Sequence, residues 1–399
     1  MFERLERMPD DPILGLMAAF RADPDKQKVD LGVGVYRNER GETPVLEAVR
    51  RAEQAVLSRQ TSKTYVAPVG NAPFNQAMER LVFGENHPTL KAGRIRSIQT
   101  PGGCGALRVG AELIVRAMPD AIVHVSTPTW ANHVPLLTGS GVKLERYPYY
   151  DGATGGVNFN AMLETIDRLP AKSIVLLHAS CHNPTGADLS EAQWREVLAV
   201  VAKRGLTPYI DMAYQGLGTG VVEDALGPRM FAAELPEVIV AVSCSKNFGL
   251  YRERTGVLHI VSQTTQSADS ILTQLVRIAR TLYSMPPDHG AAIVHEILTT
   301  DALRGSWLDE VGSMRNRITG LRKNLVAALV KACPQRDFSF IERQRGMFSY
   351  LGVNPDQVRA LRERHHCYMM EDSRMNVAGL RGDDIDYFAN AIAEVLTTK

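Results

Sequence analysis

Short apolar runs alternate with helix-like stretches between residues 95 and 261, and this alternation constrains the fold more than any other feature of the sequence. Several runs are rich in valine and isoleucine at consecutive positions, as in strands that are buried on both faces of a parallel sheet. The strand candidates are Ile122–Ser126, Ser173–His178, Pro208–Met212, Val238–Ser243 and Gly256–Val261. Ser190 and Gln193 have the spacing of a capping box that opens one of the intervening helices. The pattern predicts an α/β unit with a mainly parallel sheet.

The last quarter of the chain follows a different pattern. A long helical pattern spans 302–332, and two short strand candidates follow it, at Asp337–Ile341 and Met347–Leu351. Helix, strand and helix patterns complete the chain. This order predicts a second, smaller α+β unit, which we expect the N-terminal residues to join because they have no sheet partner nearby. The expected division is a large domain over 46–309 and a small domain built from 1–45 and 310–399.

Composition excludes several classes of protein. Of the 399 residues, 45% are hydrophobic and 22% are charged, which is typical of a globular chain rather than a disordered one. The 45 basic and 44 acidic residues leave a net charge of +1, so no global positive field favours nucleic acid. The five cysteines lack a C-x-x-C pair, which argues against a disulfide framework or a zinc site. Without a secretory signal or a long apolar run, we expect a cytoplasmic protein with no membrane contact.

A glycine-rich loop, Thr100–Gly105, precedes one of the predicted helices. Backbone N–H groups in such a turn can bind a phosphate, and the helix dipole adds to this attraction. The loop matches neither a P-loop nor a complete dinucleotide-binding fingerprint. An ordinary turn is therefore the alternative interpretation.

Other polar residues follow the strand candidates, at the edge where open α/β sheets bind ligands. Trp130 could stack on a flat ring, or it could be a core or interface residue. The turn Asn183–Gly186 could aim the Asn183 amide into a site, or it could be only a turn. His178 and His182 are four residues apart, but the turn that follows and the lack of a third ligand argue against a metal site.

Two ionisable residues occupy strand ends. Asp211 lies inside an apolar strand candidate, where a carboxylate costs free energy unless it is paired, so we expect a cation or a donor beside it. Lys246 follows Val238–Ser243, and a desolvated amine there would have a lowered pKa and could form an imine, although most lysines are solvated surface groups. Arg254 lies eight residues further on. An amine, an acid, an indole, a phosphate-binding loop and an arginine are together the groups that pyridoxal 5′-phosphate requires.

Six segments match one family in order along nearly the whole chain. They are Asp11–Leu16, Leu31–Tyr36, Cys181–Gly186, Asp211–Gly216, Ser243–Arg254 and Arg374–Gly379. The chain resembles the aspartate and aromatic-amino-acid aminotransferases, which are fold-type I pyridoxal-phosphate enzymes. The resemblance implies a large α/β domain with a mainly parallel, seven-stranded type of sheet flanked by helices, and a smaller α+β domain. It also implies a homodimer with shared active sites.

The resemblance implies roles toward the cofactor. Lys246 would bind it covalently and later move the substrate proton, and Asp211 would keep the pyridine nitrogen protonated. Tyr214 and Asn183 would hydrogen-bond the phenolic oxygen, and Trp130 would stack on the ring. The phosphate would be held by Gly103, Cys104, Ser243, Ser245 and Arg254, together with Tyr65 of the partner subunit.

The resemblance also implies a substrate site without a metal. Arg374 would bind the α-carboxylate through two guanidinium N–H groups. Gly34, Trp130 and Asn183 would line the substrate. Arg280 would reach a distal carboxylate across the dimer interface.

Three places depart from the family pattern. Cys104 stands where serine or threonine is usual, and a thiol is a weaker donor. Glu371 and Asp372 precede Arg374 where small residues are common, and they would oppose an anionic substrate if they faced inward. Met285 replaces an asparagine of aspartate-specific members and is compatible with an aromatic side chain.

The expected reaction is ping-pong transamination between L-aspartate and 2-oxoglutarate. Aspartate is the leading candidate for the amino donor because Arg280 is present. Tyrosine or phenylalanine is the alternative donor because aromatic-accepting relatives keep the same arginine. A pyridoxal-phosphate lyase or decarboxylase, and a non-catalytic binding protein with the same fold, are alternatives from other classes.

Overall fold

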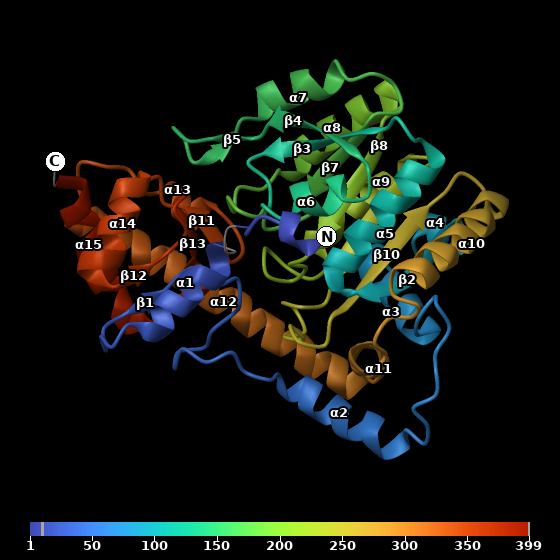
Figure 1. Ribbon diagram of the computed structural model, residues 1–399, viewed down its shortest axis with the longest axis horizontal. Helices are drawn as coiled ribbons and strands as arrows, with labels where there is room; N and C mark the ends of the chain where they lie inside the picture. Colours follow the sequence, from blue (N-terminus) through green and yellow to red (C-terminus); the bar gives the residue numbers. More distant parts are fainter. Residues whose placement is uncertain (9–11, 398–399) are drawn as a thin grey trace.

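The computed structural model describes residues 1–8 and 12–397 and contains two lobes of unequal size that share one long helix (Figure 1). Asp11, the first residue of a segment quoted above, lies outside the described residues.

A seven-stranded sheet forms the centre of the larger lobe, with the order β2-β10-β9-β8-β7-β3-β4. Its strands are β2 (Ile95–Pro101), β3 (Ile122–Thr127), β4 (Lys143–Pro148), β7 (Ile174–His178), β8 (Thr207–Met212), β9 (Val238–Ser243) and β10 (Thr255–Val261). Only β10 runs antiparallel to its neighbours, so the prediction of a mainly parallel α/β sheet is confirmed. The five predicted strands are present, with ends that differ by at most one residue from those expected.

The central strands are apolar because helices cover both faces of the sheet. All residues of β9 and β10 are buried. Along β9, Val238, Val240 and Val242 enter one hydrophobic cluster, whereas Ile239 and Ala241 enter another on the opposite face. This division follows the alternation of side chains along a strand. The edge strands β2 and β4 carry many polar residues, which explains why the apolar pattern did not reveal them.

The remaining elements of the larger lobe are mostly covering helices. They are α2 (Glu47–Arg59), α3 (Ala72–Phe83), α4 (Pro88–Lys91), α5 (Gly102–Ala117), α6 (His133–Thr138), α7 (Phe159–Asp167), α8 (Glu191–Arg204), α9 (Leu226–Glu234), α10 (Thr265–Leu282) and α11 (His289–Thr299), with a hairpin of β5 (Tyr150–Asp151) and β6 (Gly156–Val157). The predicted capping box opens α8, where Ser190 and Gln193 exchange side-chain and backbone hydrogen bonds. None of the helices in 1–8 and 12–397 is long and apolar enough to cross a membrane.

The smaller lobe joins the two ends of the chain. Its elements are α1 (Pro12–Ala22), β1 (Val29–Asp30), α13 (Phe340–Arg343), β11 (Phe348–Tyr350), α14 (Pro355–His365), β12 (Cys367–Tyr368), β13 (Arg374–Asn376) and α15 (Ile385–Thr397). Strand β1 pairs in parallel with β12, and β11 pairs in antiparallel with β13. The N-terminal region thus shares a sheet with the C-terminal region.

The long helix α12 (Asp301–Ala332) belongs to both lobes (Figure 1). Trp307 and Ile318, in its first part, lie in the hydrophobic cluster of the larger lobe. Leu325 and Leu329, in its last part, lie in the cluster of the smaller lobe. The two cores are therefore built on one continuous helix.

The strand predicted at Asp337–Ile341 is wrong. The Asp337 carboxylate accepts a hydrogen bond from the Ser339 N–H at 2.7 Å, which closes a turn, and the short helix α13 follows. Phe338 and Ile341 are both buried in the smaller core, three residues apart as on a helix. The hydrogen bond from the backbone to the Asp337 side chain therefore favours a turn over an extended strand at this place.

Arg322 connects α12 to the loop around β11. Its guanidinium is buried and donates six hydrogen bonds, and burial lowers its pKa to about 10. The acceptors are the carbonyls of Ile341, Arg345, Gly346 and Phe348 and the hydroxyl of Ser349.

Arg322→Met should lower the free energy of unfolding by about 3 kcal/mol, because the change leaves several buried carbonyls without a donor. Urea unfolding followed by circular dichroism measures the loss. Lys323→Met, an exposed change at the next position, is the matched control and should stay within about 0.5 kcal/mol of wild type. Equal stabilities of the two variants would contradict the role given to Arg322.

Candidate active site

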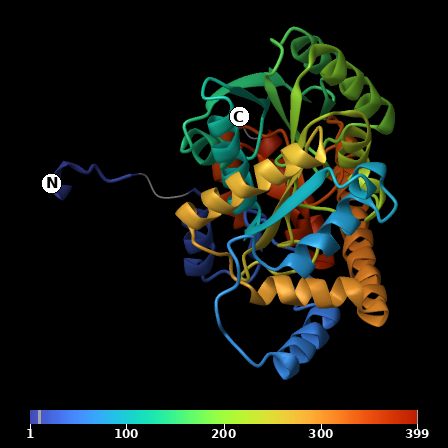
Figure 2. The same cartoon turned by 90° about the vertical axis from the view of Figure 1, so that its right-hand side faces the viewer.

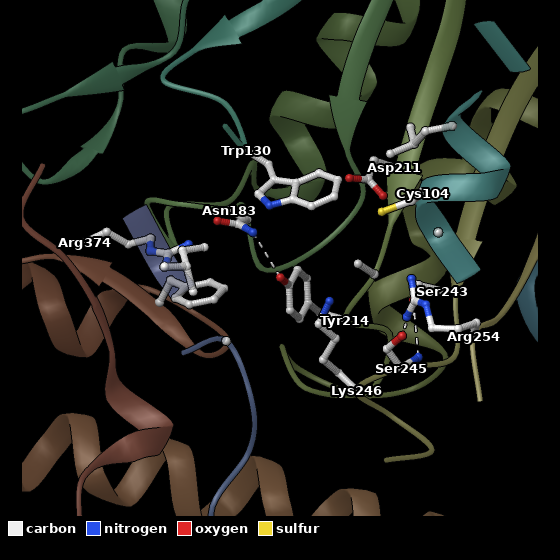
Figure 3. A pocket seen from close by; sticks show the side chains of 16 residues that line it. Cys104, Trp130, Asn183, Asp211, Tyr214, Ser243, Ser245, Lys246, Arg254 and Arg374 are labelled. Carbon is white, nitrogen blue, oxygen red and sulfur yellow. Dashed lines mark hydrogen bonds between the residues drawn. The ribbon is translucent and has the colours of Figure 1, made fainter. Parts of the chain in front are cut away.

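A pocket opens between the lobes, at the carboxyl edge of the parallel strands (Figure 3). Its empty volume is about 780 Å³ including the open mouth, within the range of small-molecule sites. The structure brings together Gly34, Gly103, Cys104, Trp130, Asn183, Asp211, Tyr214, Ser243, Ser245, Lys246, Arg254 and Arg374 as lining residues. These are the predicted site residues with two exceptions.

The exceptions are Tyr65 and Arg280. Tyr65 lies between α2 and α3 with 88% of its side chain exposed, and Arg280 is exposed in the last turn of α10. Neither lines the pocket of its own chain.

Asp211 is held near the end of β8 by a histidine. Its Oδ2 lies 3.0 Å from Nε2 of His133, whose Nδ1 lies 2.8 Å from the Thr129 hydroxyl. That hydroxyl also lies 3.3 Å from Nε2 of His178. Burial pushes the pKa of Asp211 up, but the hydrogen bond and charge of His133 outweigh it, so the pKa lies below the ordinary value of 3.8. Asp211 is therefore an anion at neutral pH, although it is largely buried.

Lys246 follows β9 and points toward the middle of the pocket (Figure 3). Its Nζ lies 4.8 Å from the ring centroid of Tyr214. Burial lowers the pKa of the amine, and the opposing charge of Asp211 limits the shift. A lysine with a lowered pKa is the type of amine that reacts with a carbonyl.

Tyr214 and Asn183 form a polar pair beside this amine. The Asn183 Nδ2 donates to the Tyr214 hydroxyl at 3.1 Å, and burial raises the pKa of Tyr214. The other polar atom of the Asn183 amide is buried without a partner among the described residues. The pair can therefore accept a further polar group from a ligand.

The glycine-rich loop begins α5, where Gly102 lies beside Arg254 and Gly103 beside Ser243. The Ser243 hydroxyl donates to that of Ser245 at 3.1 Å. Gly102 has a φ of +69°, and a Cβ there would lie 2.7 Å from a guanidinium nitrogen of Arg254, so only glycine fits. Helix N-terminus, hydroxyls and guanidinium together form an anion cradle of the size of a phosphate. The thiol of Cys104 adds only a 3.9 Å contact with the Asn132 amide.

Arg374 lies on β13, at the smaller-lobe side of the pocket (Figure 3). One Nη donates to the Gly32 carbonyl at 2.8 Å, and the guanidinium carbon lies 4.7 Å from the Phe348 ring centroid. Its Nε is buried without a partner among the described residues. The guanidinium is fixed but keeps N–H groups for a carboxylate.

The sequence did not predict several residues of the site. Ile13, Leu107, Ala213 and Phe348 line the pocket, and His133 lies against Asp211. The position of His133 after a strand end was a usable signal, since that edge of the sheet binds ligands. Phe348 does not follow a strand of the predicted parallel sheet, so its position gave no comparable signal.

The residues present fit pyridoxal phosphate. The anion cradle, the buried anion Asp211, the amine of Lys246 and the Tyr214–Asn183 pair correspond to the phosphate, ring nitrogen, aldehyde and phenolic oxygen of that molecule. Among the residues that the structure describes, no group of histidine, cysteine and acidic side chains could hold a metal ion.

Comparison with known proteins identifies the family. Residues 26–392 match the family described as aminotransferase class I and II. The chain belongs to this family. This aminotransferase is 46% identical to the aromatic-amino-acid aminotransferase of Pseudomonas aeruginosa, over 99% of this chain and 98% of that one. It is 44% identical to the aspartate aminotransferase of the same organism, over 99% and 100% of the two chains.

Solved structures agree with this assignment. The aromatic-amino-acid aminotransferase of Burkholderia pseudomallei, covalently bound to pyridoxal phosphate, is 46% identical and superposes with a TM-score of 0.97 over the full length of both chains. The fold of this aminotransferase is that of the fold-type I pyridoxal-phosphate enzymes, and pyridoxal 5′-phosphate is its cofactor.

His133→Phe should raise the pKa of Asp211, because the hydrogen bond that opposes the effect of burial is lost. Protonation of Asp211 then begins at a higher pH, so activity is lost first on the acidic side. The ratio of wild-type to variant kcat/KM should grow about tenfold between pH 8 and pH 5. His87→Phe, at a half-buried histidine outside the pocket, is the control. A pH-independent loss in His133→Phe would show that the histidine acts only through packing.

Proposed function

We propose that the protein transfers an amino group between L-aspartate and 2-oxoglutarate. The observation that carries the proposal is the convergence of Lys246, Asp211 and Arg374 in one pocket. Pyridoxal 5′-phosphate supplies an aldehyde that captures the amino group and a protonated ring that accepts the electron pair left at Cα.

The catalytic residues are Lys246, Asp211 and Tyr214. The amine of Lys246 would hold the cofactor and, once substrate has displaced it, would move the proton between Cα and the cofactor's C4′ carbon. Asp211, kept anionic by His133, holds a proton on the ring nitrogen. Tyr214 and Asn183 bind the phenolic oxygen at the positions described above.

The remaining pocket residues position the two ligands. Trp130 covers one face of the ring. The backbone of Gly103 and Cys104, with Ser243, Ser245 and Arg254, binds the phosphate. Arg374 binds the α-carboxylate, with Gly34, Trp130 and Asn183 beside it.

A second copy of the chain completes the site in this proposal. Tyr65 and Arg280 lie outside the pocket of their own chain, and both are exposed, so the partner subunit's Tyr65 would reach the phosphate and the partner subunit's Arg280 the distal carboxylate. Residues 1–8 project from the body of the molecule (Figure 2), and Phe2 and Leu5 are exposed there. Exposed apolar side chains of this kind support a homodimer. We propose that this dimer acts in the cytoplasm.

We also propose that 46–309 form a large domain and that 1–45 with 310–399 form a small one. The hydrophobic cluster of the smaller lobe supports this division, because all its residues lie within 1–45 and 310–399. In this proposal the boundary at 309/310 falls within helix α12 rather than in a linker.

Aromatic amino acids are the second candidate donors. Relatives of both names occur at similar identity, and Phe348 and Ile13 add apolar surface to the pocket. Met285, close in sequence to Arg280, is flexible enough to accommodate a ring. Release of CO₂ or ammonia without a 2-oxo acid acceptor would instead indicate a pyridoxal-phosphate lyase or decarboxylase.

Borohydride reduction of the holoenzyme should fix the cofactor on Lys246, because this amine is the one in the pocket. Peptide mass spectrometry after digestion locates the label. Unreduced holoenzyme is the control. Recovery of the label on another lysine would refute the central assignment.

Arg280→Ala should reduce kcat/KM for aspartate by about 100-fold, because a charged hydrogen-bonded contact to the distal carboxylate is lost. Turnover of phenylalanine should change by less than about threefold. Arg277→Ala, an exposed change on the same helix, is the matched control. Unchanged aspartate turnover in Arg280→Ala would remove the argument for an aspartate enzyme.

A further inference from the structure

The turn before Arg374 is rigidly built. The Ser373 N–H donates to the Met370 carbonyl at 2.9 Å, and the Ser373 hydroxyl accepts from the Val353 N–H at 3.0 Å. Ser373 has a φ of +73°, which a serine adopts only when its surroundings hold it there. The two acidic residues of this turn, Glu371 and Asp372, therefore have defined places.

Asp372 is turned back toward Arg374. Its Oδ1 accepts from the Arg374 backbone N–H at 3.0 Å, and its Oδ2 accepts from the Tyr350 hydroxyl at 3.2 Å. Tyr350 lies directly opposite Arg374 in the β11–β13 pair, so the two side chains share a face of this ribbon. The carboxylate is thus anchored by two hydrogen bonds beside the residue that binds substrate.

The charge of Asp372 reaches the guanidinium. Burial lowers the pKa of Arg374, and the carboxylate of Asp372 is the largest influence that opposes this shift. Both acids are exposed, but Glu371 forms no hydrogen bond or ion pair within residues 1–8 and 12–397, whereas Asp372 forms two hydrogen bonds. The two neighbouring acids thus differ in their relation to the pocket.

We propose that Asp372 is a specificity-determining residue, whose fixed negative charge beside Arg374 weakens the binding of the more anionic substrates. This inference rests on the proposed function, because it concerns the carboxylate site of that reaction. Phenylalanine is neutral overall, aspartate carries one net negative charge and 2-oxoglutarate carries two. Repulsion grows with the net charge of the ligand, so Asp372 lowers the affinity for 2-oxoglutarate most and for phenylalanine least. It acts through Arg374 and touches no reacting atom.

Asp372→Asn is the decisive variant, because the amide keeps the size of the side chain and can still bind the Arg374 N–H and the Tyr350 hydroxyl. In this variant KM for 2-oxoglutarate should fall about fivefold and KM for aspartate about twofold, with little change for phenylalanine or in kcat. The differences should shrink in 0.5 M KCl, because salt screens an exposed charge to within about 4 Å. Glu371→Gln removes the neighbouring charge and should leave all three constants at wild-type values.

Equal KM changes for the three substrates would assign Asp372 a purely structural role and overturn the proposal, as would no change at all. A binding measurement separates failure of the proposed role of Asp372 from failure of the proposed function. Calorimetry of the holoenzyme with glutarate, an unreactive dicarboxylate, and 3-phenylpropionate, an unreactive monocarboxylate, needs no turnover. If none of the amino acids is transaminated, the proposed function is wrong, and tighter glutarate binding in Asp372→Asn still supports the charge effect. Unchanged glutarate affinity refutes it.

Discussion

The pocket depends on one hydrogen bond, between the carboxylate of Asp211 and the ring of His133. A buried carboxylate without such a partner would be protonated at neutral pH or would destabilise the fold. His133 can serve because Thr129 and His178 lie behind it, so three neighbouring strands, β3, β7 and β8, fix the position of one charge. The amine of Lys246 takes its electrostatic surroundings from this anion. The parallel sheet thus does more than support the site, since its strand order decides which groups meet.

The sequence predicted the centre of the fold better than its edges. Strands β7, β8 and β9 are covered on both faces, and their apolar runs are visible without any structure. Strands β2 and β4 have only one neighbour each and carry polar side chains, so nothing in their composition distinguishes them from loops. At Asp337–Ile341 the apolar residues suggested a strand, but a hydrogen bond from Ser339 to the Asp337 carboxylate formed a turn instead.

The lining of the pocket was predictable for a chemical reason. Lysine and asparagine beyond strand ends, and aspartate inside a strand near its end, are recognisable because each is unusual there, and the family resemblance joined them into one site. The contact of His133 with Asp211 depends on the direction of α6, which the sequence does not reveal. Phe348 reaches the pocket from the smaller lobe by packing alone. The roles of Tyr65 and Arg280 remain predictions. If these residues act in the site of a second copy of the chain, they are not expected to line the pocket of their own chain.

Helix α12 has a mechanical consequence. It runs for 32 residues, about 48 Å, and is packed into one core at its start and into the other at its end. The C-terminal part of α12 is packed into the smaller lobe, so this lobe, which carries Arg374, moves with that end of the helix. Any tilt of the smaller lobe must either bend helix α12 or displace the carbonyl groups that accept hydrogen bonds from Arg322. The bending stiffness of helix α12 therefore limits how far the two lobes can separate at the pocket while both hydrophobic cores stay intact.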